Sequence, residues 1–185
     1  EDTHDVLGLR EGVTAPATSG SSSPRRQQQV AKLFPQAKFT EIRGNVDTRL
    51  KKIASGVADD TILAAAGLNC LHIPSWPGTV FRRLEYTESV PAVGQGAIAI
   101  QCRAADAALL AAALDAPTAR RVTLERAIQT AIGGGCQMAF GALATDDQIH
   151  FYHEKTGRRA LPLRPDDFLH PEATAARILK EVGLQ

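Results

Sequence analysis

Short apolar runs, separated by glycine and proline, divide the first 90 residues into alternating strands and helices. Residues 10–23 are rich in Gly, Ser, Thr, Ala and Pro, which predicts a loop with one short strand. A helix is expected to begin with Ser23 as its N-cap and Pro24 at its first position. The elements predicted next are a helix over 25–34 that Pro35 ends, a strand over 37–43, a helix over 47–54 closed by Gly56, a buried strand over 61–66, a short helical piece after Gly67 and a loop over 74–78. This alternation predicts a parallel or mixed α/β sheet.

The pattern in the second half of the chain predicts consecutive strands between two helices. Gly94-Gln95-Gly96 is expected to open a strand over 97–102, followed by an Ala- and Leu-rich helix over 106–114. Pro117 indicates a boundary, after which apolar residues recur at helical spacing over 118–132. The other predicted elements are antiparallel strands over 138–144, 149–153 and 159–163 and an amphipathic helix over 171–182. Together they predict a small α+β domain.

Composition and charge narrow the class of protein. Of the 185 residues, 44% are hydrophobic and 22% are charged, as is usual for a soluble globular chain of one large or two small domains. No apolar run approaches the roughly 18 residues that span a bilayer, so no membrane partner is expected. The net charge of +1 and the 5% of aromatic residues argue against a nucleic-acid partner. Three cysteines without C-x-x-C spacing disfavour disulfides and metal sites and indicate a cytoplasmic protein.

Two clusters of arginine follow the ends of predicted strands. The first places Arg25 and Arg26 in the first turn of a helix, where positive charge opposes the helix dipole. Either the chain gathers positive charge there for an anionic ligand, or both side chains point into solvent. The second cluster places Arg43 at a strand end and Arg49 in the next helix. Because open α/β sheets bind ligands beyond the carboxyl ends of their strands, the two clusters together indicate a polyanionic ligand that carries carboxylates or phosphates.

One of the three cysteines differs from the others in its surroundings. Cys136 follows three glycines, which give it little steric cover and indicate a reactive or modified thiol. Cys70 and Cys102 lie in apolar segments, and we expect them to be small buried hydrophobic residues.

Six motifs, taken in order, resemble the porphobilinogen deaminase (hydroxymethylbilane synthase) family, in its middle and C-terminal portion. The resemblance spans nearly the whole chain, and its blocks R-G-N-V-D-T-R-L and P-A-V-G-Q-G-A are highly specific. The motifs that carry it are Ser22–Gln27, Arg43–Leu50, Ile62–Leu68, Pro91–Ala97, Glu125–Ala127 and Gly134–Gln137.

The resemblance implies a transferase of tetrapyrrole (haem) biosynthesis. The family polymerises porphobilinogen into hydroxymethylbilane with loss of ammonia, on a covalent dipyrromethane cofactor that a thioether holds. By resemblance, the cofactor is attached to Cys136. The residues that the resemblance places against the cofactor are Ser23, Arg25, Arg26, Arg43, Gln95 and Gly96, and those against the substrate carboxylates are Arg25, Arg26, Arg43 and Arg49.

The same resemblance implies a fold and a division into domains. The fold expected is α/β, with a periplasmic-binding-protein-like lobe, a mixed sheet with flanking helices, followed by a small α+β C-terminal domain. The expected parts are 1–11 as the end of domain one and hinge, 12–90 as domain two, 91–115 as a segment that returns to domain one, and 116–185 as the C-terminal, cofactor-bearing domain. We expect a monomer for the full-length protein.

The chain also departs from the family pattern. The H-S-x-K-D block, whose aspartate handles the protons of ammonia loss, has no counterpart here, so no catalytic residue is assigned. Cys70 stands where the family pattern has an arginine. We therefore expect a truncated chain that does not complete the reaction alone. The alternative is a divergent, non-catalytic module that binds polycarboxylate ligands.

Overall fold

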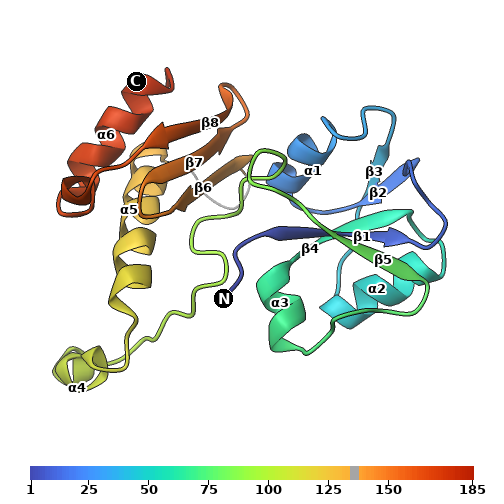
Figure 1. Ribbon diagram of the computed structural model, residues 1–185, viewed down its shortest axis with the longest axis horizontal. Coiled ribbons are helices and arrows are strands. Elements are labelled where there is room, and N and C mark those ends of the chain that lie inside the picture. The colour runs from blue at the N-terminus through green and yellow to red at the C-terminus, as the bar shows by residue number, and fades with distance from the viewer. Residues whose placement is uncertain (134–137) are drawn as a thin grey trace.

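The structure, a computed structural model, describes residues 1–133 and 138–185 and contains two β-sheets flanked by helices (Figure 1). The strands are β1 (Asp5–Arg10), β2 (Thr18–Gly20), β3 (Lys38–Thr40), β4 (Asp60–Ala64), β5 (Thr79–Arg83), β6 (Phe140–Ala144), β7 (Gln148–His153) and β8 (Gly157–Pro162). The α-helices are α1 (Pro24–Val30), α2 (Val46–Ala54), α3 (Ala65–Cys70), α4 (Ala107–Ala111), α5 (Ala116–Ile132) and α6 (Pro171–Glu181), and the 3₁₀ helices are η1 (Ala104–Asp106) and η2 (Pro165–Phe168).

The larger sheet is mixed, as predicted, with the strand order β3-β2-β4-β1-β5. β1 pairs antiparallel with β4 and β5, whereas β2 pairs parallel with β3 and β4. Because side chains alternate along a strand, Leu7 packs with Ile62 on the face that α1 covers, while Val6 packs with Leu63 on the face that α2 and α3 cover (Figure 1). Helices therefore cover both faces of the larger sheet.

The C-terminal unit follows its prediction closely. β6, β7 and β8 form an antiparallel sheet in that order, and α5 and α6 pack against it. One apolar cluster unites these elements, with Leu124 and Ile128 from α5, Phe151 from β7 and Ile178 from α6 at its centre. Among the described residues, none of the helices has the length and apolar character that crossing a membrane requires.

The prediction for residues 97–114 is wrong. Residues 97–103 form no strand, and Ile98 is 82% exposed. The helix expected over 106–114 is reduced to η1 and the five-residue α4, whose Leu109 is 80% exposed. A strand needs a neighbouring strand and an apolar helix needs a face to cover, and the described residues supply neither for this segment. Pro117 lies in the first turn of α5, so it stands where the long C-terminal helix begins.

Several other elements differ from their predictions. No strand was predicted for β1 or β5, although both lie in the larger sheet. α1 is shorter than predicted and ends at Val30. The strand expected over 61–66 ends at Ala64, and α3 begins at the next residue, so that Gly67 lies inside that helix.

The two sheet units meet where β6 lies against residues 90–91. A Cβ atom added to Gly141 would lie 2.6 Å from the carbonyl oxygen of Pro91 and 2.8 Å from that of Val90. Real Cβ atoms essentially never approach backbone oxygens so closely. The absence of a side chain at Gly141 is therefore what allows the C-terminal unit to pack against this segment.

We expect Gly141→Ala to lower the free energy of unfolding by about 1–3 kcal/mol, because backbone atoms on both sides must move apart. Urea unfolding measures this change. Gly67→Ala is the control, since a Cβ atom there meets only ordinary contact, at 3.8 Å from Val46, and alanine favours a helix. Equal stability of the two variants would contradict the close approach at Gly141.

Candidate functional site

The first arginine cluster lies at the start of α1. Ser23 is the N-cap, and its side chain accepts a hydrogen bond from the backbone N–H of Arg26. Pro24 occupies the first helical position, as predicted. This start directs Arg25 and Arg26 toward the sheet, so neither arginine points simply into solvent.

The two arginines share one buried carboxylate, that of Asp5 at the start of β1. Arg25 Nη1 donates to Asp5 Oδ2 at 2.8 Å, and Arg26 Nη2 donates to Asp5 Oδ1 at 2.7 Å. Ser89 Oγ donates to Oδ2 at 2.8 Å, and Gln95 Nε2 donates to Oδ1 at 3.2 Å. We call these five residues the Asp5 cluster. It joins β1, α1 and the segment that follows β5.

The Asp5 cluster carries a net positive charge in a buried position. The Asp5 side chain is 0% exposed, and that of Arg25 is 6% exposed. Burial alone would raise the pKa of Asp5, but the charges of Arg26 and Arg25 hold the pKa of that carboxyl well below its usual range. Two guanidinium groups on one carboxylate leave one positive charge without a counter-charge inside the cluster.

That remaining charge is accessible from a groove between α1, α2 and α3. Arg26 and Arg49 both line this groove, which has a volume of about 590 Å³ and apolar walls that include Leu63 and Ile73. Partial burial and the neighbouring charge of Arg26 lower the pKa of Arg49. Two like charges beside an apolar wall favour an anion that has an apolar body. Arg26 from the first cluster and Arg49 from the second therefore line the same groove.

The structure does not bring Arg43 to this groove. Its side chain is 79% exposed and pairs with Glu41 at 2.6 Å. Gly44 follows at φ +123°, and its carbonyl oxygen accepts a hydrogen bond from Arg49 Nε. Arg25 is also occupied, because Asp5 and the carbonyl oxygen of Val90 accept its hydrogen bonds.

The segment Gly94-Gln95-Gly96 forms a tight turn rather than the start of a strand. Gly94 has φ +69° and Gly96 has φ +81°, a backbone region that favours glycine. Gln95 Nε2 donates to the carbonyl oxygen of Thr3 at 2.8 Å as well as to Asp5. The sequence prediction placed Gln95 and Gly96 near the cofactor, and the structure places Gln95 in the Asp5 cluster.

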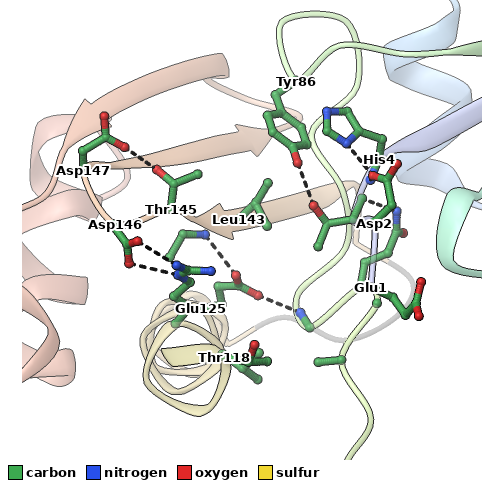
Figure 2. A pocket seen from close by; sticks show the side chains of 18 of the residues that line it. Glu1, Asp2, His4, Tyr86, Thr118, Glu125, Leu143, Thr145, Asp146 and Asp147 are labelled. Atoms are coloured by element: carbon green, nitrogen blue, oxygen red, sulfur yellow. Dashed lines mark hydrogen bonds and ion pairs between the residues drawn. The ribbon is translucent and has the colours of Figure 1, made fainter. Parts of the chain in front are cut away.

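A second cavity, of about 670 Å³, lies between the two sheet units (Figure 2). Glu125 from α5 points into the space between the Gly94 turn and β6, where it accepts hydrogen bonds from two backbone N–H groups. His4 stacks on Tyr86 at a ring-centroid distance of 3.9 Å, and Tyr86 lies 4.8 Å from His150. In the part of the chain that the structure describes, no group of three metal-ligating side chains could hold a metal ion.

Sequence analysis missed Asp5 and gave Glu125 no role. Asp5 stands in a polar N-terminal segment, and no local pattern indicates that it is buried beneath two arginines about 20 residues away. Glu125 does stand in the Glu125-Arg126-Ala127 motif, which was the available signal.

The structure tests the predictions for two of the three cysteines. Cys136 lies outside the described residues. Cys70 and Cys102 are both exposed, so the expectation that they are buried is wrong. Cys70 is the last residue of α3 and is exposed, whereas Leu68 in the same helix is buried. Cys102 lies in segment 97–103, which forms no strand.

Comparisons with known proteins agree on one family. Residues 1–111 match the family model described as porphobilinogen deaminase, dipyromethane cofactor binding domain. Porphobilinogen deaminase of Brevibacillus brevis is 43% identical over 152 residues, which cover 78% of this chain and 48% of that protein. The porphobilinogen deaminase of Sphingopyxis alaskensis is 45% identical over 155 residues, which cover 77% of this chain and 48% of that protein.

The extent of these matches defines what they show. The chain spans about half the length of the curated relatives that it matches. The family model covers more than half of the chain, and the relatives match over more than three quarters of it. The chain belongs to the porphobilinogen deaminase family.

Proposed function

We propose that this chain is part of a hydroxymethylbilane synthase, which joins porphobilinogen units with loss of ammonia. The observation that carries the proposal is the groove in which Arg26 and Arg49 face an apolar wall. Porphobilinogen is a pyrrole with two carboxylate side chains, so it combines an apolar ring with groups that guanidinium forks bind. Family membership favours this enzyme over a non-catalytic binding module.

The dipyrromethane cofactor fits the same groove for the same reason, since it carries the same carboxylate side chains on two linked pyrroles. Arg26 and Arg49 would hold these carboxylates, and Cys136 would hold the group covalently. When bound, the cofactor would supply the end on which the chain of pyrroles grows. Arg25 and Gln95 would act through Asp5, because their hydrogen bonds orient the carboxylate that in turn orients Arg26. Ser23 would act by fixing the start of α1.

The division into domains forms part of the proposal. The mixed sheet with helices on both faces supports a periplasmic-binding-protein-like lobe over 12–90, to which β1 adds a strand. The apolar side chains of Ile98 and Ile100 are exposed. This exposure supports the proposal that segment 91–115 packs into a further domain. Residues 116–185 would be the domain that bears the cofactor.

We expect Arg49→Gln to weaken porphobilinogen binding by roughly 10- to 100-fold, because it removes one charged hydrogen-bonding partner of a carboxylate. Titration calorimetry of the chain with porphobilinogen measures the dissociation constant. Arg43→Gln is the control, since this exposed arginine lies away from the groove, and its affinity should stay within about twofold. In the complete enzyme, the formation of hydroxymethylbilane should fall in the same order.

Either of two results would overturn the proposal. One is a chain that does not bind porphobilinogen at all while it remains folded. The other is an equal loss of affinity in the Arg43 and Arg49 variants, which would place the ligand outside the groove.

A further inference from the structure

We propose that Glu125 is a positioning residue, which holds the turn at Gly94-Gln95 in place and thereby couples the C-terminal unit to the Asp5 cluster. Its functional meaning rests on the proposed function, because the Asp5 cluster orients Arg26 in the groove. The connection from Glu125 to the Asp5 cluster runs through hydrogen bonds, and these can be measured without enzymatic turnover.

The first part of this connection is the carboxylate of Glu125. Oε2 accepts a hydrogen bond from the backbone N–H of Gly94 at 2.7 Å, and Oε1 accepts one from that of Ala144 at 2.9 Å (Figure 2). The Glu125 residue is 2% exposed. A buried carboxyl group that is tied to two backbone segments holds them at a defined separation.

The two backbone donors at this site suit the two oxygens of a carboxyl group. β6 is an edge strand, so the N–H of Ala144 points away from β7 and has no strand partner. The N–H of Gly94 belongs to a tight turn and faces the same place. Two oxygens on one planar group satisfy both donors, whereas a carboxamide offers one oxygen and places its own N–H₂ against the second donor.

The second part of the connection runs from Gly94 to Asp5. Gly94 adopts φ +69°, which directs the following Gln95 side chain back across the N-terminal segment. Gln95 Nε2 donates to the carbonyl oxygen of Thr3 at 2.8 Å and to Asp5 Oδ1 at 3.2 Å. The same Oδ1 accepts hydrogen bonds from Arg26 Nε and Nη2. Two adjacent residues thus separate the Glu125 carboxylate from the acceptor that orients Arg26.

Charged groups of α5 itself and of other elements surround Glu125 without bonding to it. Arg121 on α5 is the nearby cation that acts on its carboxylate. Asp146, Asp147 and Asp2 line the same cavity, and Arg121 and Arg83 pair with Asp146 and Asp2 respectively. The hydrogen bonds that the Glu125 carboxyl accepts among the described residues are those from Gly94 and Ala144. Replacing Glu125 leaves the ion pairs of Arg121 and Arg83 in place.

Hydrogen exchange followed by NMR tests the proposal at single groups. In Glu125→Gln, we expect the amide of Gly94 to exchange about tenfold faster, because one of the two acceptors is lost. The Nε–H of Arg26, which Asp5 accepts, should also exchange several times faster. The amide of Leu7 in β1, paired with β4 and β5, reports overall stability and should stay within about twofold.

A second variant tests the connection from its other end. Gln95→Ala should accelerate exchange at Arg26 Nε–H as Glu125→Gln does, and the double variant should add no further acceleration, since both changes interrupt one connection. Arg126→Gln, an exposed neighbour on α5, is the matched control and should leave all three rates unchanged.

Three outcomes would overturn the proposal. Faster exchange at Gly94 without a change at Arg26 would make Glu125 a local cap. Additive effects of the Glu125 and Gln95 variants at Arg26 would show two independent contacts. Acceleration of Leu7 by the same factor would reduce the effect to a general loss of stability. A failure to bind porphobilinogen would leave these rates as they are, so failure of the proposed function is recognisable separately.

Discussion

Replacing Asp5 by asparagine should lower the free energy of unfolding by about 3–5 kcal/mol, because it leaves two arginines buried without their shared counter-charge. The volume of the side chain is nearly unchanged, so a packing defect contributes little. The loss is a large share of the roughly 5–15 kcal/mol that stabilises a typical domain. Urea unfolding followed by circular dichroism measures it.

Two further variants define what such a loss would mean. Asp146→Asn removes an exposed carboxylate that also pairs with two arginines, and its effect on stability should be much smaller, because solvent screens these ion pairs. Asp5→Asn combined with Arg25→Met should regain part of the lost stability, because the more deeply buried of the two uncompensated charges is gone. A loss no larger than that of Asp146→Asn would refute the assignment of Asp5 as a buried counter-charge.

Lowering the pH from 8 to 5 should favour the folded state by about 3–4 kcal/mol through two buried carboxyl groups. His150 and His153, whose pKa values burial lowers, act in the opposite direction over the same range. Burial raises the pKa of Asp60 to about 6 and that of Glu125 to about 7. A carboxyl whose pKa is higher in the folded than in the unfolded state binds protons more tightly when folded. Its contribution is complete below the unfolded pKa, near 4, and is lost as the pH rises through 6 to 7.

Variants isolate these two carboxyls from the other titrating groups. Asp60→Asn and Glu125→Gln should each flatten the increase in unfolding free energy between pH 8 and 5, relative to the unchanged chain. Asp60 Oδ1 accepts a hydrogen bond from Ser19 Oγ at 2.6 Å, and its buried Oδ2 has no partner among the described residues, as suits a protonated carboxyl. If both variants kept the full pH dependence, the carboxyls would have to titrate normally.

Local periodicity predicted the parts of the fold that depend on near neighbours. The spacing of Leu124 and Ile128 indicated α5, and turns at close intervals indicated β6 to β8, which pair with their successors along the chain. β1 was missed because its partners lie more than 50 residues away and its pattern is short. Residues 97–102 show the converse, since a strand-like pattern forms no strand when none of the described strands lies beside it.

Sequence motifs selected two of the residues that line the candidate groove, but they did not predict how the arginines are arranged. The arginine motifs indicated an anionic ligand, and the structure brings Arg26 and Arg49 to one groove. Sequence gave no sign that Asp5 would accept the hydrogen bonds of Arg25, or that Arg43 would pair with its neighbour Glu41. Which arginine binds a ligand and which binds the protein depends on where carboxylates come to lie, and that is a property of the whole fold.

The place of β1 between β4 and β5 has a consequence for synthesis on the ribosome. β1 is made before both of its partners, which are residues 60–64 and 79–83. Asp5 also needs Ser89 and Gln95 to complete its hydrogen bonds. In a nascent chain that ends before Gln95, the carboxylate of Asp5 and the two arginines cannot yet be buried together. Pairing between strands that are distant in sequence is also slow. We therefore expect the larger sheet to form in one step, only after Gln95 has left the exit tunnel.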